Sequence, residues 1–172
     1  AARIASLTYT PVANGNGAAR STFDYKVNDS RLGVVAATMT IDVTADNDLP
    51  VAQTSQVTTG ENAPKTFAAS DFSYSDVESD TLASITVSSL SLASGDTLTV
   101  NQGAGNVSVT NGMTITAAQI PSLTYTPATN ASGSGRSSFV FKVNDSGSGV
   151  AGATMTINVT PNNHVPVAQA SQ

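Results

Sequence analysis

Acidic residues gather at two places in an otherwise weakly charged sequence. The segments 46–48 (Asp-Asn-Asp) and 76–80 (Asp-Val-Glu-Ser-Asp) hold five of the twelve Asp and Glu residues. Neighbouring carboxylates repel one another unless a cation lies beside them, and the nearest basic residues to the second segment are Lys65 and Arg136. Calcium is a hard cation that binds about six to eight oxygen ligands. The local sequence therefore favours a metal near these carboxylates.

A plainer interpretation stays open for each of these residues. Segment 76–80 is also compatible with a solvated turn, segment 46–48 with a polar linker, and Asp145 with a turn aspartate that follows a strand. The spacing is not that of an EF-hand, because Thr81 stands where the loop needs glycine and Val87 where it needs glutamate.

Other chemistry has few residues to use. The 172 residues include one histidine, no cysteine and no tryptophan, with a net charge of -5. A catalytic triad needs a general base beside its nucleophile. With a single histidine in the sequence, we expect no enzyme. Seven scattered Lys and Arg residues form no basic patch, which argues against nucleic acid. No apolar run approaches the roughly 20 residues needed to span a membrane.

The sequence repeats itself at a fixed interval. Residues 4–56 align without a gap with residues 120–172, at an offset of 116, and 33 of these 53 positions are identical. Self-similarity at a fixed period is typical of tandem arrays. We therefore expect the chain to be a piece of a longer array, with one whole repeat and about half of another.

Alternating apolar and polar residues predict strands throughout the repeat. Phe139, Phe141 and Val143 alternate with polar or smaller residues, and Met155, Ile157 and Val159 do the same. A period of two places one set on a buried face, and Gly, Asn and Ser fill the turns between them. The sequence predicts an all-β, Greek-key sandwich with strands near 53–59, 65–69, 82–88, 96–101, 104–110, 122–126, 137–144 and 152–160, and a helical turn near 117–119.

Pro50 marks the expected boundary between units. We expect residues 1–49 to form the C-terminal half of one repeat with three strands, residues 50–164 to form a complete repeat, and residues 165–172 to begin the next. Half a repeat leaves one apolar face without an opposing sheet. Disorder, a truncated repeat and packing on another copy are the three outcomes, and we favour a homodimer through residues 1–45.

A family resemblance rests on motifs near the unit boundary. Segment 46–50 (DNDLP) resembles a shortened cadherin linker, segment 60–64 (GENAP) the early Glu-Asn motif, and segment 76–78 the acidic motif that follows. Asp145 matches the lone aspartate that ends the penultimate strand. The segments LTYTP and KVNDS look most like the tandem cadherin-like, Ig-like β-sandwich repeats of large bacterial surface adhesins and biofilm proteins. The resemblance covers nearly the whole chain.

The resemblance implies a shared Ca2+ site between neighbouring repeats of the same chain. Its ligands would be Asp46, Asn47, Asp48, Asp76, Glu78 and Asp145, with Asp80 as a further candidate. Asp29 and Glu61 would face other junctions. The second linker, Asn162-Asn163-His164, has lost both carboxylates. We therefore expect at most one good site, with Glu61 at the surface, His164 exposed and the Arg136 stem covering apolar side chains.

Two functions follow from the resemblance. The first is a calcium-stiffened spacer in an extracellular adhesin on a bacterial surface, supporting cell adhesion or biofilm formation. The alternative is a β-sandwich module that binds a carbohydrate or a protein. The nearly identical copies favour the spacer, because a specific binding face is more often confined to one unit. The sequence does not name a host or matrix ligand.

Overall fold

The computed structural model describes residues 4–28, 34–145 and 152–164. The chain divides into two compact units, a first unit Ala1–Asn47 and a second unit Asp48–Gln172. Each unit is described by itself. Asp29 and the predicted start of a further repeat at 165–172 lie outside the described residues.

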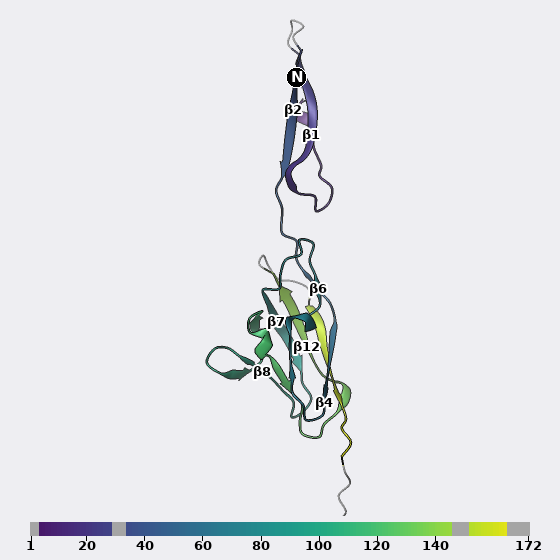
Figure 1. Ribbon diagram of the computed structural model, residues 1–172, viewed down its shortest axis with the longest axis vertical. Coiled ribbons are helices and arrows are strands. Elements are labelled where there is room, and N and C mark those ends of the chain that lie inside the picture. The colour runs from purple at the N-terminus through teal and green to yellow at the C-terminus, as the bar shows by residue number, and fades with distance from the viewer. Residues whose placement is uncertain (1–3, 29–33, 146–151, 165–172) are drawn as a thin grey trace, which may run out of the picture. The chain divides into compact units, whose positions relative to one another are not determined.

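The first unit consists of one antiparallel hairpin preceded by a short 3-10 helix. The helix η1 covers Ile4–Ser6, and the strands are β1 (Gly17–Asn28) and β2 (Val34–Val43). Their register pairs Phe23 with Met39 and shifts once between Gly17 and Ser21. Figure 1 shows the hairpin in purple and blue.

The prediction of three strands in this half repeat is wrong for the described residues. Residues 7–12 form no strand, whereas the repeated sequence at β11 (Thr124–Thr126) does. The reason is the missing neighbours: β11 pairs with β5 (Lys65–Thr66) on one side and with β8 (Thr97–Asn101) on the other. A strand is defined by its ladder partners, so the same residues stay irregular without them.

The second unit is a sandwich of two sheets. The larger sheet has the order β10-β7-β12-β13-β4, and the smaller has the order β5-β11-β8-β9. The chain crosses repeatedly between the sheets, for example from β7 to β8 and from β11 to β12. The further strands are β4 (Ser55–Gly60), β7 (Ser84–Ser91), β9 (Asn106–Ser108), β10 (Thr114–Thr116), β12 (Gly133–Asn144) and β13 (Gly152–Thr160).

The core of the second unit lies between these two sheets. The alternating residues of β12 and β13 point into it, and Phe139, Phe141, Met155 and Ile157 are fully or almost fully buried. Aromatic rings form its centre, with Phe72 and Phe141 in an edge-on contact at 5.1 Å between ring centroids. Within the described residues, every buried hydrophobic side chain belongs to this unit. The all-β sandwich is confirmed.

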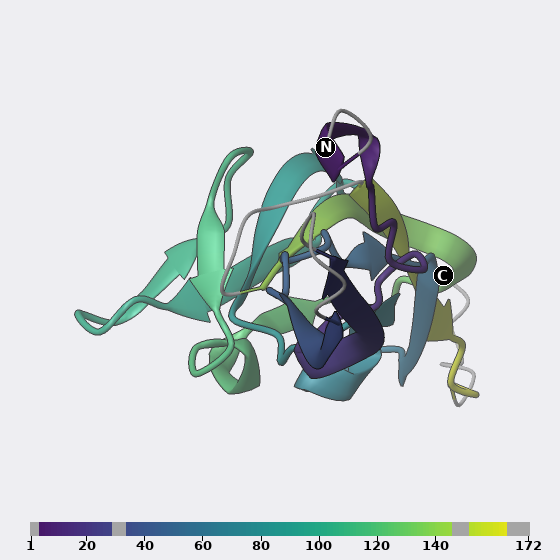
Figure 2. The same cartoon turned by 90° about the horizontal axis from the view of Figure 1, so that it is seen from above.

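Short elements close the ends of the sandwich. The turn predicted near 117–119 is present and leads into η3 (Ile120–Ser122), with Pro121 in its first turn. The β8–β9 arm projects from the sandwich, as the view from above shows (Figure 2).

The chain enters and leaves this sandwich at opposite ends. Strands β4 and β13 pair in parallel, with Ser55 beside Met155 at one end and Gly60 beside Thr160 at the other. The start of the unit precedes β4 and its exit follows β13, so a parallel pair puts the two at different ends of the sheet. We call them the entry end and the exit end. Figure 1 shows the yellow C-terminal strand leaving beyond the label of β4.

Candidate functional site

Two short strands position the acidic loop at the entry end. Strand β3 (Val51–Ala52) follows the linker, and β6 (Tyr74–Ser75) directly precedes the acidic loop 76–80. They pair antiparallel, with Val51 beside Ser75. This pairing carries the linker and the acidic loop to the same place, although about 30 residues separate them in the sequence. The sequence patterns predicted neither strand, because two residues show no periodicity.

The acidic loop is folded by its own polar contacts. The backbone N–H of Asp80 donates to Asp76 Oδ1 at 2.8 Å, and the Tyr74 hydroxyl donates to the carbonyl of Asp80 at 3.0 Å. Ser79 adopts a left-handed conformation with φ 63°. The other oxygen, Asp76 Oδ2, is buried without a hydrogen-bond partner among the described residues. A buried carboxylate oxygen without a partner is costly, so this atom suits a cation as ligand.

The linker reaches the same loop through its backbone. The Asp48 N–H donates to Glu78 Oε2 at 3.2 Å. Asp145 is buried directly after β12, and β12 ends beside the start of β7, since Asn144 pairs with Ser84. Asp145 therefore lies at the entry end with the acidic loop.

The predicted calcium ligands are divided between the two units. Asp46 and Asn47 belong to the first unit, and Asp48, Asp76, Glu78, Asp80 and Asp145 belong to the second. Across the ranges that the structure describes, no three acidic or histidine side chains converge as a metal site. The contact of Asp48 with Glu78 brings two of the predicted residues together, and calcium at this end stays a prediction.

Glu61 organises the exit end and is not a surface residue as predicted. It is only 5% exposed. Its Oε2 accepts the N–H of Asn162 at 2.9 Å and lies 3.2 Å from His164 Nε2. The side-chain amide of Asn162 also donates to the backbone carbonyl of Glu61 at 3.0 Å. The backbone hydrogen bond from Asn162 lowers the pKa of Glu61, with burial opposing it and His164 adding to it.

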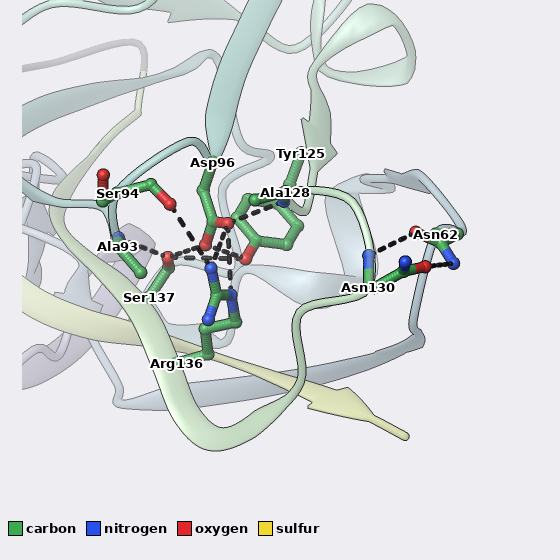
Figure 3. A network of polar contacts seen from close by, with 9 residues as sticks. All are labelled: Asn62, Ala93, Ser94, Asp96, Tyr125, Ala128, Asn130, Arg136 and Ser137. Carbon is green, nitrogen blue, oxygen red and sulfur yellow. Dashed lines mark hydrogen bonds and ion pairs between the residues drawn. The ribbon is translucent and has the colours of Figure 1, made fainter. Parts of the chain in front are cut away.

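A buried carboxylate joins the two sheets near the exit end. Asp96 lies just before β8, and four residues from two segments, 125–128 and 136–137, donate hydrogen bonds to it (Figure 3). Its side chain is fully buried and forms an ion pair with Arg136 Nη2 at 2.8 Å from Oδ1. Arg136 Nε donates to the same oxygen at 3.1 Å. The guanidinium of Arg136 therefore binds Asp96, a contact that was not predicted from the sequence.

Neutral donors complete the shell around Asp96. The Ala128 N–H donates to Oδ1 at 2.9 Å. The hydroxyls of Ser137 and Tyr125 both donate to Oδ2, Ser137 at 2.6 Å. Burial alone would raise the pKa of Asp96, but hydrogen bonds from Arg136, Ser137, Tyr125 and Ala128 outweigh it and lower the pKa to about 2. Burial, followed by the hydrogen bond to Asp96, raises the pKa of Tyr125. We call these five residues the Asp96 network.

One sequence signal could have indicated this network. Asp96 is the only charged residue between Asp80 and Arg136. A single charge in a long uncharged stretch is rarely buried without a partner, and the next charge in the chain is Arg136. Forty residues separate the two, so no local pattern connects them.

Comparison with known proteins places this sandwich in a family. Residues 47–158 match the family model described as bacterial Ig domain. No curated protein and no solved structure matches the chain. Bacterial Ig domains are a non-catalytic structural family typical of surface proteins, and no helix in the described part of the chain is long and apolar enough to cross a membrane. The expected Ig-like repeat is confirmed, and the chain belongs to the bacterial Ig domain family.

Proposed function

We propose that this chain is a spacer segment of a bacterial cell-surface adhesin, in which Ig-like repeats are joined end to end and support adhesion or biofilm formation. The observation that carries the proposal is the parallel pairing of β4 with β13, together with the 116-residue repeat. Each unit that is built this way passes the chain from one end of a sandwich to the other. A strand of nine residues such as β13 advances it by about 30 Å.

The entry end supports a calcium-stiffened junction. Asp76 offers a buried oxygen that has no hydrogen-bond partner among the described residues, and Glu78 accepts a hydrogen bond from the linker at Asp48. The carboxylates of Asp76, Glu78 and Asp48 do not converge on one point among the described residues, so Ca2+ would draw them together as its ligands. Asp46, Asn47, Asp80 and Asp145 are the remaining candidates. Oxygen donors of this kind are those that Ca2+ prefers. The bound ion would neutralise their mutual repulsion and so stiffen the junction.

The exit end supports a junction that needs no cation. His164 stands at the position of Asp48 in the repeat, and Asn162 at the position of Asp46. Both contact the buried carboxylate of Glu61. Hydrogen bonds from these residues thus take the place of a metal bridge. The proposal is therefore one calcium junction in this chain, at the entry end.

Thermal unfolding with Ca2+ and with chelator tests the calcium junction. A ligand at 100 times its dissociation constant stabilises the folded state by about 2.7 kcal/mol, so calcium should raise the midpoint. The double variant Asp76→Asn with Glu78→Gln should remove the gain. Asp24→Asn, which removes one charge from strand β1, should keep it. A calcium gain that survives in the double variant would place the ion elsewhere.

The spacer function is tested by length. Small-angle scattering of chains that carry one, two and three added copies of residues 50–165 should show a maximum dimension that grows by a constant increment. The increment should be the same with Ca2+ and with chelator, because each added junction carries the linker Asn162-Asn163-His164. An increment that shrinks with each added copy would mean that the repeats fold back on each other, and the spacer role would be rejected.

A further inference from the structure

The hairpin of the first unit keeps the backbone geometry of the hairpin β12–β13. Phe23 pairs with Met39 as Phe139 pairs with Met155, and both hairpins shift register at the same place. The same kind of hydrogen bond stabilises the register shift in both hairpins. A backbone N–H donates at 2.6 Å to the side chain of Asp42 in one hairpin and of Asn158 in the other. The first hairpin therefore already has the strand register that the matching hairpin has inside a complete sandwich.

Its apolar face is nevertheless uncovered among the described residues. Phe23 is 38% exposed and Met39 44%, whereas Phe139 and Met155 are 1% and 0% exposed. No strand in the described part of the chain pairs with the edge of β1 opposite β2, although β12 has β7 at that edge. The pocket over this face is lined by Leu7, Tyr9, Phe23, Met39 and Ile41 among others.

The polar residues at the edge of this face also correspond to those that surround Asp96. Tyr9, Ser21 and Arg20 are the repeat positions of Tyr125, Ser137 and Arg136, which hold Asp96. The Tyr9 hydroxyl already lies 3.0 Å from Ser21 Oγ, as the Tyr125 hydroxyl lies 3.4 Å from Ser137 Oγ. Within the described residues Arg20 is exposed and forms no ion pair.

The turn before β1 contains the counterpart of the remaining donor to Asp96, a backbone N–H. Val12 is the repeat position of Ala128, whose N–H binds Asp96. The turn is closed by the Gly15 N–H, which donates to the Val12 carbonyl at 3.0 Å, as Ala131 does to Ala128 at 3.2 Å. Arg20 Nη2 lies beside this turn, since a Cβ on Gly15 would be 2.9 Å from it. The four groups that surround Asp96 thus have counterparts in one place.

We propose that this face is a docking site for a segment of the first half of the same repeat type, one that carries an aspartate at the position of Asp96 followed by apolar residues at the positions of Leu98 and Val100. The aspartate would bind Arg20, Tyr9, Ser21 and the N–H of Val12. The apolar residues would cover Phe23 and Met39, and residues 7–10 would become a strand against the new one.

A second copy of this chain fits the face less well. Its Asp96 is already buried in its own sandwich. Its hairpin would bring another Arg20 to the same edge. Asp24 and Asp42, the aspartates within the hairpin strands, alternate with Phe23 and Ile41 and so point to the opposite face. Charge complementarity therefore favours the first-half segment.

The test uses the full chain with [methyl-13C]methionine and a synthetic peptide of residues 82–101. The chain has three methionines, so NMR should show Met39, Met113 and Met155 separately. Peptide binding should move the Met39 signal toward that of Met155 and leave the other two in place. A peptide with Asp96→Asn should bind about tenfold more weakly, because hydrogen bonds to charged groups are the stronger ones.

Variants separate specific docking from apolar adhesion. In the chain with Arg20→Ala, the two peptides should bind equally well, at the weaker level. Equal binding of both peptides to the unaltered chain would overturn the proposal. A dimer of the chain alone by sedimentation, with Met39 already at the Met155-like position, would assign the face to a second copy and overturn it as well.

A covalent version keeps the proposal falsifiable if the free peptide does not stay in solution. Residues 50–119 are fused directly ahead of Ile4, in the order in which they precede Ile120. Met39 should then adopt the signal position of Met155, and residues 4–47 should resist proteolysis. A Met39 signal that stays where it is in the unfused chain would reject the docking site.

Discussion

Phe23 and Phe139 occupy the same position in two hairpins with the same register, but only Phe139 is buried. The residues around them are largely identical, so local sequence does not explain the difference. What differs is the rest of the unit: Phe139 meets Phe67 and Phe72 from the opposite side of the core. The hairpin geometry is thus locally encoded, and the burial that stabilises it comes from segments distant in the sequence.

The largest expected difference between the hairpins is in the core. Phe139→Ala should lower the free energy of unfolding of the second unit by about 3–5 kcal/mol, because it removes a buried ring and leaves a cavity. Phe23→Ala should change it by less than about 0.5 kcal/mol, as exposed substitutions do. Urea unfolding followed by the Met155 methyl signal measures both. An equally large loss for Phe23→Ala would mean that its face is covered in solution.

The second difference is in the Asp96 network. Asp96→Asn should destabilise the second unit by about 3 kcal/mol, because it leaves the Arg136 charge without its partner. Arg20→Ala in the other hairpin should have almost no effect on the same transition. Urea unfolding at neutral pH compares the two variants. A loss below about 1 kcal/mol for Asp96→Asn would show that water compensates Arg136.

The third prediction concerns acid. The pKa of Asp96 is lowered from 3.8 to about 2 in the folded state. The unfolded chain therefore takes up a proton first as the pH falls, and the stabilisation, about 2 kcal/mol, is present above pH 4 and lost between pH 4 and 2. Unfolding measured across this range should show the loss. The Asp96→Asn variant serves as control and should have a flatter profile.

The smallest difference should come from one hydroxyl. Tyr125→Phe removes a donor to Asp96 and should cost about 1–2 kcal/mol. Tyr9→Phe removes the same atom from the exposed counterpart, whose hydroxyl contacts only Ser21 among the described residues, and should cost less than about 0.5 kcal/mol. Thermal unfolding of both variants sharpens the comparison. Equal costs would contradict the assignment of Tyr125 to the network.

Periodicity predicted the long strands well because their alternation reflects burial on one face. The predicted strand 152–160 has the bounds of β13, and strand 137–144 lies within β12. The same reasoning failed at residues 7–11, where alternation is present but no strand among the described residues pairs with them. A period-two pattern shows which face of a segment can be buried. Whether that face is buried depends on the strands that pair with the segment.

Polar contacts were harder to predict because their partners are far apart in the sequence. Arg136 binds Asp96 across 40 residues, and Asn162 binds Glu61 across 101. Neither pair has a spacing that a local motif could reveal. The acidic loop was noticeable only because its residues are adjacent, and its contact with Asp48 depends on two short strands that show no pattern.

The parallel pairing of β4 with β13 also fixes how the second unit responds to force. Six residue pairs, from Met155 beside Ser55 to Thr160 beside Gly60, connect the first long strand to the last. When the two ends of the unit are pulled apart, these strands slide along each other, and the hydrogen bonds between them are strained together. A hairpin pulled from its open end separates one bond at a time. The unit is thus arranged to resist tension along its length by shear.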